Sequence, residues 1–349
     1  MPPMIRCPPS PWRRFRALAA VLLLLACGCA PRFGGYTPVR GEARLYSGHF
    51  IAADGAVLPL RRWLPAGAAS TAVVVALHGF NDYSNFFEAP AAYLSNHGVA
   101  CYAYDQRGFG RAPGRGQWSG TAVYVDDLRD FVDQVRRHHR SVPVYLLGES
   151  MGGALAIAAA TATPPPQVDG LILAAPAVWG RDTMPWYQRW LLAVLGRTAP
   201  GLHLTGEGLD ILPSDNIDML RALARDPLVI KETRVDAVYG LADLMDLALG
   251  RASRLRLPTL LLYGERDQVV PREPVYRMIA AMPGRPLVRT GFYERGYHLL
   301  LRDLQAERPW QDILAWIGDH RIAFPSGADR RLPRDVALAS GQPELRRSD

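Results

Sequence analysis

The sequence predicts an α/β fold, with a mostly parallel, twisted sheet flanked by helices. Four continuous apolar runs lack polar alternation, which is typical of strands covered on both faces: 73–77, 144–147, 171–174 and 260–263. Amphipathic helical patterns lie between these runs, as expected when parallel strands are joined by helices. The second run ends in a G-x-S-x-G turn at residues 148–152 and passes directly into an alanine-rich helical segment.

The first 26 residues are interpreted as an export signal that is not part of the fold. Arg13, Arg14 and Arg16 form a positive region, and the apolar stretch after them is too short to cross a bilayer as a permanent helix. Residues 24–29 read L-L-A-C-G-C and resemble the lipobox of bacterial lipoproteins. This resemblance implies that Cys27 is lipidated and begins the mature chain, so we expect an exported protein anchored to a membrane of the cell envelope. A plain cleaved signal is the alternative.

The remaining chain divides into a tether, one domain and a tail. Residues 27–42 contain Gly and Pro and are predicted to tether the anchor to a domain that spans residues 43–324. Residues 43–64 read as two extended segments joined by an Ala-Asp-Gly turn, which indicates a hairpin. Residues 325–349 have little apolar pattern and are expected to form a mobile tail.

The alternation of strands and helices lapses between Pro176 and Pro258. We interpret residues 176–257 as a mostly helical cap over the edge of the sheet that carries the site. Trp186 and Trp190 fall on one helical face within it. We expect this face to pack on the domain core; the alternative is a lid that touches lipid.

Charge and composition exclude two broad classes of protein. The apolar fraction of 49% is too high for a disordered chain. The formal net charge of +7 falls to about +3 without the segment before Cys27, and no arginine cluster is interleaved with aromatic residues. We therefore expect no nucleic-acid partner.

Ser150, at the centre of the G-x-S-x-G turn, is the candidate nucleophile. A serine hydroxyl needs a base to take its proton and an acid to orient that base. Asp267 follows the apolar strand 260–263, and His298 comes after a further short strand, so the order is serine, aspartate, histidine. Glu265 is the nearest rival for the acid and His78 for the base.

The oxyanion formed during serine attack requires fixed donors. We expect these to be the backbone N–H of Met151, which begins the helix after the nucleophile, and that of Phe80, which follows the strand ending at Leu77. His78 is predicted to organise this loop through hydrogen bonds. The mechanism requires no metal or organic cofactor.

Taken together, these motifs resemble the α/β-hydrolase superfamily. Within it the chain is similar to the serine hydrolases grouped as monoacylglycerol lipase, lysophospholipase and serine aminopeptidase-like proteins. The resemblance covers roughly residues 46–324 and is carried by these segments: 78–80, 105–110, 148–153, 226–227, 264–271 and 297–298. It implies an α/β-hydrolase fold with a helical cap, and for Asp105–Gly110 a structural role at the floor of the site.

The sequence departs from the monoacylglycerol lipase pattern near the nucleophile. Close relatives carry H-G-x-G-E-H and G-H-S-M-G, whereas here Asn81, Asp82 and Tyr83 replace the G-E-H portion. Glu149 occupies the position of the histidine. We expect the Glu149 side chain to point away beneath the turn.

The family resemblance implies a serine hydrolase that cleaves carboxylic esters, with monoacylglycerols, lysophospholipids or other acyl esters as substrates. An amidase or aminopeptidase on the same residues is the alternative, since Asp236, Asp243 and Asp246 in the predicted cap offer acids for a substrate amine. A non-catalytic lipid-binding lipoprotein is a further, less favoured alternative.

Overall fold

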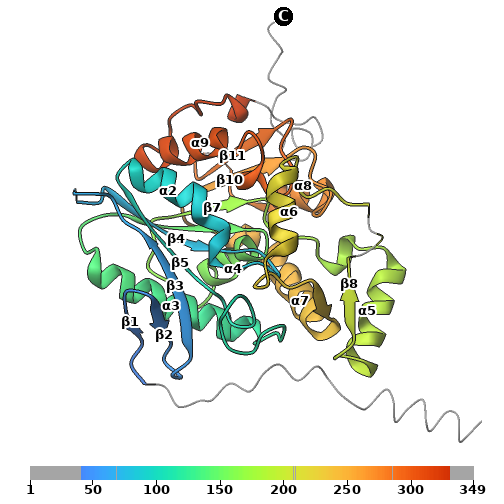
Figure 1. Cartoon of the computed structure of the whole chain (residues 1–349). Coiled ribbons are helices and arrows are strands. Elements are labelled where there is room, and N and C mark those ends of the chain that lie inside the picture. Colours follow the sequence, from blue (N-terminus) through green and yellow to red (C-terminus); the bar gives the residue numbers. More distant parts are fainter. Residues whose placement is uncertain (1–40, 68, 207, 209, 285, 331–349) are drawn as a thin grey trace, which may run out of the picture.

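A computed structural model describes residues 41–330 except 68, 207, 209 and 285. The predicted signal, Cys27 and most of the tether lie outside the described residues. Within them a nine-stranded sheet has the order β1-β2-β3-β5-β4-β6-β7-β10-β11 (Figure 1). Its strands are β1 Arg44–Leu45, β2 His49–Ile51, β3 Val57–Trp63, β4 Ala72–Leu77, β5 Val99–Tyr104, β6 Val144–Glu149, β7 Gly170–Ala174, β10 Thr259–Gly264 and β11 Val288–Tyr293.

The six strands from β5 to β11 in this order pair in parallel, and β1 to β3 add an antiparallel edge. All four apolar runs of the sequence are central strands with every residue buried. A continuous apolar run suits this position because both faces of a parallel sheet are covered. The predicted hairpin is β2 and β3, which join around a turn at Gly55 with φ of 87°.

Helices cover the two faces of the sheet and enclose separate cores. The helices of the domain are α2 Glu88–Asn96, α3 Thr121–His138, α4 Met151–Ala160, α7 Val235–Arg251, α8 Arg272–Ala281 and α9 Glu307–Gly318. Strand β4 shows the division: Val73, Val75 and Leu77 pack with α3, α4, α7 and α8, whereas Val74 and Ala76 pack with α2 and α9. This alternation follows from the two-residue period of a strand.

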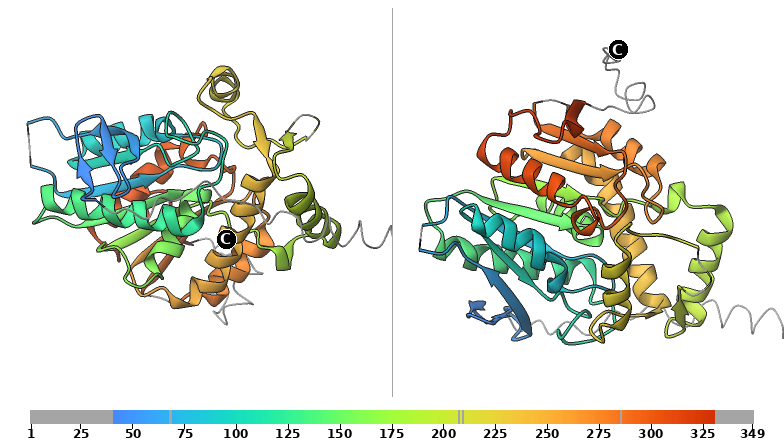
Figure 2. Two further views of the ribbon diagram at one scale, coloured as in Figure 1. Left: turned by 90° about the horizontal axis from the view of Figure 1, so that it is seen from below. Right: turned by 45° about the horizontal axis from the view of Figure 1, so that its top comes forward.

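The interval predicted as a cap contains α5 Trp186–Thr198, β8 His203–Thr205, α6 Ile217–Arg225, β9 Glu232–Arg234 and α7. Helix α5 and strand β8 lie together on the side of the molecule away from β1–β3, whereas α6 lies apart from them (Figures 1 and 2). In contrast, α7 packs against α4 and buries Ala242, Leu244 and Ala248. The interval is therefore part cap and part domain core.

The end of the described chain differs from the expected mobile tail. Residues 325–330 pack on the domain, where Ser326 N donates to Asp312 Oδ1 at 2.9 Å and Arg289 Nη2 donates to Asp329 Oδ2 at 2.6 Å. Ala328 is buried in the short helix η5, Ala328–Arg330. The prediction of a tail from residue 325 is wrong for this stretch, because specific polar contacts hold a segment that lacks apolar periodicity. Residues 331–349 lie outside the described part.

None of the helices within the described ranges combines the length and the apolar character needed to span a membrane.

Candidate active site

The G-x-S-x-G turn joins β6 to α4 with Ser150 at its apex. Ser150 has φ of 50° and ψ of −114°, a conformation that non-glycine residues rarely adopt. The strand and the helix approach closely, since a Cβ on Gly148 would lie 2.3 Å from the carbonyl oxygen of Gly152. A Cβ on Gly152 would lie 2.0 Å from the carbonyl oxygen of Leu77. Both glycines are thus needed for the turn that presents Ser150.

Ser150, His298 and Asp267 form one hydrogen-bonded chain. Nδ1 of His298 donates to Oδ2 of Asp267 at 2.8 Å, because a carboxylate can only accept. Nε2 is then the acceptor for the Oγ–H of Ser150 at 2.9 Å. The structure therefore brings together three side chains that lie 31 and 148 positions apart in the sequence.

Each partner of Ser150 is fixed by its own loop at the carboxyl ends of the parallel strands. Asp267 follows β10, and its Oδ1 accepts from the backbone N–H of Val269 at 2.8 Å and of Val270 at 2.9 Å. His298 follows β11 in a segment held by Asp303, which accepts from Tyr297 N at 2.7 Å. The carboxyl ends of neighbouring parallel strands meet at one sheet edge, which explains why the three loops converge.

Glu265 and His78, the alternatives for the acid and the base, are not part of this hydrogen-bonded chain. Glu265 is exposed, whereas the Asp267 side chain is fully buried against His298. His78 is fully buried, and its Nε2 accepts from Gln106 N at 3.0 Å while Nδ1 donates to Gly79 O at 2.8 Å. Burial lowers the pKa of His78 to about 4, so the ring is neutral near pH 7. It holds its loop, as predicted, and does not contact the serine chain.

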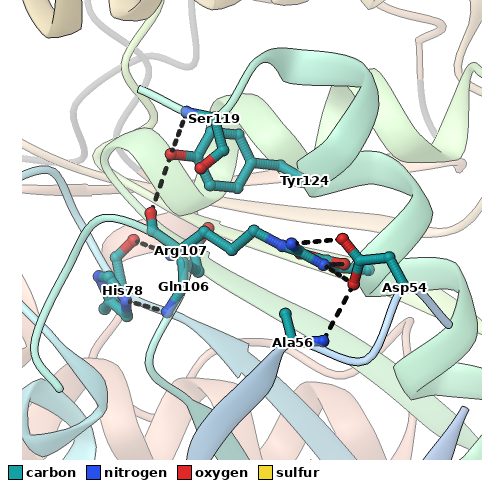
Figure 3. A network of polar contacts seen from close by, with 8 residues as sticks. Asp54, Ala56, His78, Gln106, Arg107, Ser119 and Tyr124 are labelled. Carbon is teal, nitrogen blue, oxygen red and sulfur yellow. Dashed lines mark hydrogen bonds and ion pairs between the residues drawn. The ribbon is translucent and has the colours of Figure 1, made fainter. Parts of the chain in front are cut away.

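A polar network anchors the floor beneath this loop (Figure 3). Gln106 returns a side-chain hydrogen bond to His78 O at 2.9 Å. The next residue, Arg107, forms paired contacts of 2.6–2.7 Å with Asp54 of the N-terminal hairpin and with Asp127 of α3. Such bidentate contacts fix both distance and orientation, so the loop containing Gly79 and Phe80 is tied to the rigid body of the domain.

The predicted oxyanion donors flank Ser150. Met151 is the first residue of α4, where backbone N–H groups lack acceptors within the helix. On the other side, Phe80 lines the same cavity as Ser150, and a Cβ on Gly79 would lie 3.3 Å from the Ser150 Cβ.

The structure contradicts the expected orientation of Glu149. This side chain is buried and lines the cavity, with Oε1 3.8 Å from Nε2 of His298. It does not point away beneath the turn. Gly79 makes the inward orientation possible, because any Cβ there would lie 2.2 Å from Oε2 of Glu149. Gly79 belongs to the His-Gly motif, which lies in another loop and does not by itself place the Glu149 side chain.

Buried charges surround the histidine. Burial lowers the pKa of His298, but the charge of Asp267 and its hydrogen bond to the ring raise it, Asp303 adds to this, and the raising effect is the larger. Burial raises the pKa of Glu149 to about 8 and that of Asp82 to about 6. Arg302 lies 3.6 Å from Asp82 and partly offsets this concentration of acids.

Ser150 lies in the wall of a cavity of about 660 Å³ between the domain and the cap. The cap contributes apolar side chains to its lining: Met184, Leu191, Leu192, Leu195, Leu204 and Leu223. The volume is within the range of small-molecule sites, and an apolar wall with a few polar groups suits a ligand with a hydrocarbon chain.

The three cap acids do not reach this cavity. Asp236 pairs with Arg234, and both Asp243 and Asp246 pair with Arg181. None of them is among the residues that line the space around Ser150.

The predicted packing of the cap tryptophans is wrong. Trp186 and Trp190 are 74% and 63% exposed. Helix α5 faces inward through Leu192 and Gly196 instead, and Gly196 packs so closely on Tyr239 of α7 that a Cβ would meet its ring at 2.7 Å. The indole rings of Trp186 and Trp190 therefore lie on the opposite, solvent-exposed face of α5.

Comparison with known proteins identifies relatives of the same fold. A family described as serine aminopeptidase, S33, matches residues 68–305. The monoglyceride lipase of Rattus norvegicus is 31% identical over 291 residues, which cover 82% of this chain and 93% of the relative. The monoacylglycerol lipase of Mycolicibacterium smegmatis is 28% identical, over 71% of this chain and 88% of its own.

Solved structures agree with this relationship. The monoacylglycerol lipase of Paleococcus ferrophilus superposes with a TM-score of 0.63 and 27% identity, covering 75% of this chain and 99% of its own. A soluble variant of the monoglyceride lipase of Saccharomyces cerevisiae, at 17% identity, has a TM-score of 0.66 and covers 84% of this chain and 99% of its own. The predicted α/β-hydrolase fold is confirmed. The chain belongs to the serine aminopeptidase S33 family and is a monoglyceride lipase-like α/β-hydrolase that hydrolyses carboxylic esters.

Proposed function

We propose that this enzyme is a serine esterase in which Ser150, His298 and Asp267 cleave acyl esters of the monoacylglycerol or lysophospholipid type. The hydrogen-bonded chain from Ser150 Oγ through His298 to Asp267 is the observation that carries this proposal. Its position in a largely apolar cavity supports an acyl substrate over a polar one.

The reaction follows from the positions of the protons. Ser150 Oγ bonds to the ester carbonyl carbon as its proton passes to Nε2 of His298, and the carbonyl π electrons move to the oxygen. Asp267 keeps Nδ1 protonated and stabilises the imidazolium. Collapse of the tetrahedral intermediate breaks the bond to the leaving oxygen, which takes the proton from Nε2. Water then hydrolyses the acyl-enzyme by the same steps.

The developing negative charge on the carbonyl oxygen needs donors that are already in place. We assign the backbone N–H groups of Phe80 and Met151 to this role, because their loops flank Ser150 from both sides. The hydrogen bonds of His78 and Gln106 support the loop of Phe80.

Esters are favoured over amides by the arrangement of the cap. The acids that suggested recognition of a substrate amine, Asp236, Asp243 and Asp246, are paired with arginines outside the cavity. The names of the relatives, monoglyceride lipase and monoacylglycerol lipase, agree with an acyl ester substrate.

We also propose an exported enzyme held at a membrane by a lipid on Cys27. The lipobox-like sequence supports the anchor. The exposed Trp186 and Trp190 support contact between the cap and aggregated lipid, because indole rings are favoured at the boundary between water and hydrocarbon.

A kinetic comparison of two serine variants tests the catalytic assignment. Ser150→Ala should lower kcat on monoacylglycerols by at least about 10⁴-fold and leave the unfolding midpoint nearly unchanged. Ser253→Ala removes an exposed hydroxyl and should retain full activity. A panel of acyl esters and aminoacyl amides of graded length should show ester cleavage as the dominant reaction. Retention of activity by Ser150→Ala, or faster cleavage of the amides, would contradict the proposal.

A further inference from the structure

Glu149 is a buried acid beside the reacting atoms that the serine, histidine and aspartate mechanism does not use. The Glu149 side chain is 2% exposed, and Oε1 has no hydrogen-bond partner within the described residues. That oxygen lies 3.8 Å from Nε2 of His298, the atom that takes the proton of Ser150. A buried carboxyl oxygen without a partner is costly, which indicates that its position serves another purpose.

The geometry points to the imidazolium as the group that Glu149 meets during the reaction. Ser150 transfers its proton to Nε2, so the positive charge develops on the ring that faces Oε1. Charges separated by 3.8 Å in a buried site interact far more strongly than they do in water. Asp267 contacts the opposite nitrogen, Nδ1, so Glu149 provides a second negative group on the other side of the ring.

We propose that Glu149 is a positioning residue that acts through His298: its ionised carboxylate stabilises the imidazolium, so that the enzyme is more active when Glu149 is charged than when it is neutral. This inference rests on the proposed role of His298 as the base. It adds a carboxyl group that lies outside the serine, histidine and aspartate chain and whose charge changes with pH.

The surroundings determine when this charge appears. Burial is the main cause that raises the pKa of Glu149 to about 8, and Asp82 and Asp267 raise it further. His298 and Arg302 act in the opposite direction. These groups come from the loops after β4, β10 and β11 and from the short helix η4, Leu300–Arg302. Near neutral pH the carboxyl is therefore mostly protonated, and it ionises as the pH rises through about 8.

The test is the pH dependence of kcat for wild type, Glu149→Gln and Ser150→Ala on a soluble acyl ester. Wild type should show two rises with pH, one for His298 and a second near pH 8. Glu149→Gln, which has the same shape but no charge, should match wild type within about twofold at pH 6.5 and be about tenfold slower at pH 9. A role limited to packing would lower kcat by the same factor at both pH values.

A second variant keeps the test independent of how well Glu149→Gln folds. Asp82→Asn leaves Glu149 in place but removes a charge that raises its pKa, so the second rise should move to lower pH. Asp312→Asn replaces a fully buried acid outside the cavity, and it should keep both rises where wild type has them.

The outcomes separate this inference from the proposed function. If Ser150→Ala is inactive, but wild type and Glu149→Gln have pH profiles of the same shape, the role of Glu149 is refuted and Ser150 remains the nucleophile. An unchanged second rise in Asp82→Asn refutes it as well. If wild type and Ser150→Ala hydrolyse the ester equally, the proposed function itself is wrong.

Discussion

Two buried histidines show how the surroundings of a residue determine its role. His78 and His298 are both almost inaccessible to solvent, at 0% and 4% exposure. For His78, burial dominates and lowers the pKa to about 4. For His298 the charge and hydrogen bond of Asp267, together with Asp303, outweigh burial and raise the pKa. The His78 ring therefore stays neutral near pH 7 and holds its loop, whereas the His298 ring can gain and lose a proton near neutral pH.

The raised pKa of His298 predicts the acid side of the activity profile. The base must be neutral to accept the Ser150 proton, so kcat/KM should fall as the pH drops below a midpoint above 6.5. Asp267→Asn should move this midpoint to lower pH, because it removes the charge that raises the pKa of His298 most. It should also reduce kcat by several orders of magnitude, because the ring would no longer be held with its proton on Nδ1. Initial rates between pH 5 and 9 provide the measurement. An acid limb that is absent, or unmoved in Asp267→Asn, would contradict the assignment.

The low pKa of His78 predicts a change in stability with pH. The unfolded chain binds a proton below about pH 6.5, whereas the folded chain does not until about pH 4. The free energy of unfolding should therefore decrease by about 3 kcal/mol as the pH falls from about 6.5 to about 4. His78→Gln lacks this proton, so its loss between pH 7 and 4.5 in urea titrations should be smaller than that of wild type. Equal losses in the two proteins would show that His78 ionises freely in the folded state.

At the scale of elements, the close approach of β4, β6 and α4 creates the serine turn. Gly148 and Gly152 leave no room for a side chain against the neighbouring backbone. The strained conformation of Ser150 is thereby maintained by packing on both sides of the turn. The nucleophile is a property of this strand–turn–helix unit as much as of the serine.

Adding one methyl group should break that unit. Gly152→Ala places a Cβ 2.0 Å from Leu77 O, a backbone atom that cannot rotate away, so it should lower the free energy of unfolding by about 3 kcal/mol and abolish activity. Gly250→Ala in α7 meets no atom within 4 Å and should be neutral or slightly stabilising. Urea denaturation of both variants provides the comparison, and equal stability of the two would refute the packing argument.

The exposed tryptophans on the outer face of α5 are predicted to contact lipid. Trp186→Ala combined with Trp190→Ala should reduce binding to phosphatidylglycerol vesicles by about tenfold or more in a protein that lacks the lipid anchor. Hydrolysis of a water-soluble ester should change little, because neither indole lines the cavity. Val57→Ala, in β3 and also exposed, is the matched control for loss of apolar surface. Unchanged vesicle sedimentation in the double variant would exclude this face as the lipid contact.

In the whole molecule, the parallel sheet brings residues that are far apart in the sequence together at one of its edges. The strands β4, β6, β10 and β11 deliver Phe80, Ser150, Asp267 and His298 to one edge, and the cap closes an apolar space over them. The predicted anchor would hold the domain near a membrane. Cys27→Ala should abolish incorporation of radiolabelled palmitate and release the protein from the membrane fraction; lipid labelling that persists would place the anchor elsewhere.

Much of this architecture could be predicted because its signals are local. The buried strands are continuous apolar runs, and the turn at Ser150 is marked by glycines that the backbone requires. The inward orientation of Glu149 depends on space left by Gly79, which lies 70 positions away and belongs to another loop. The packing of residues 325–330 likewise depends on Asp312 and Arg289, and not on any periodic pattern. Contacts of this kind between distant segments have no local sequence signal.

Covalent labelling by an alkyl fluorophosphonate, which reacts with activated serines, shows directly which residue is the nucleophile. Intact-mass and peptide mapping should show one adduct per chain, on Ser150, with labelling slowed by orders of magnitude in His298→Ala although Ser150 remains. Labelling of another residue, or an unlabelled protein that still hydrolyses esters, would contradict the claim that Ser150 is the nucleophile activated by His298.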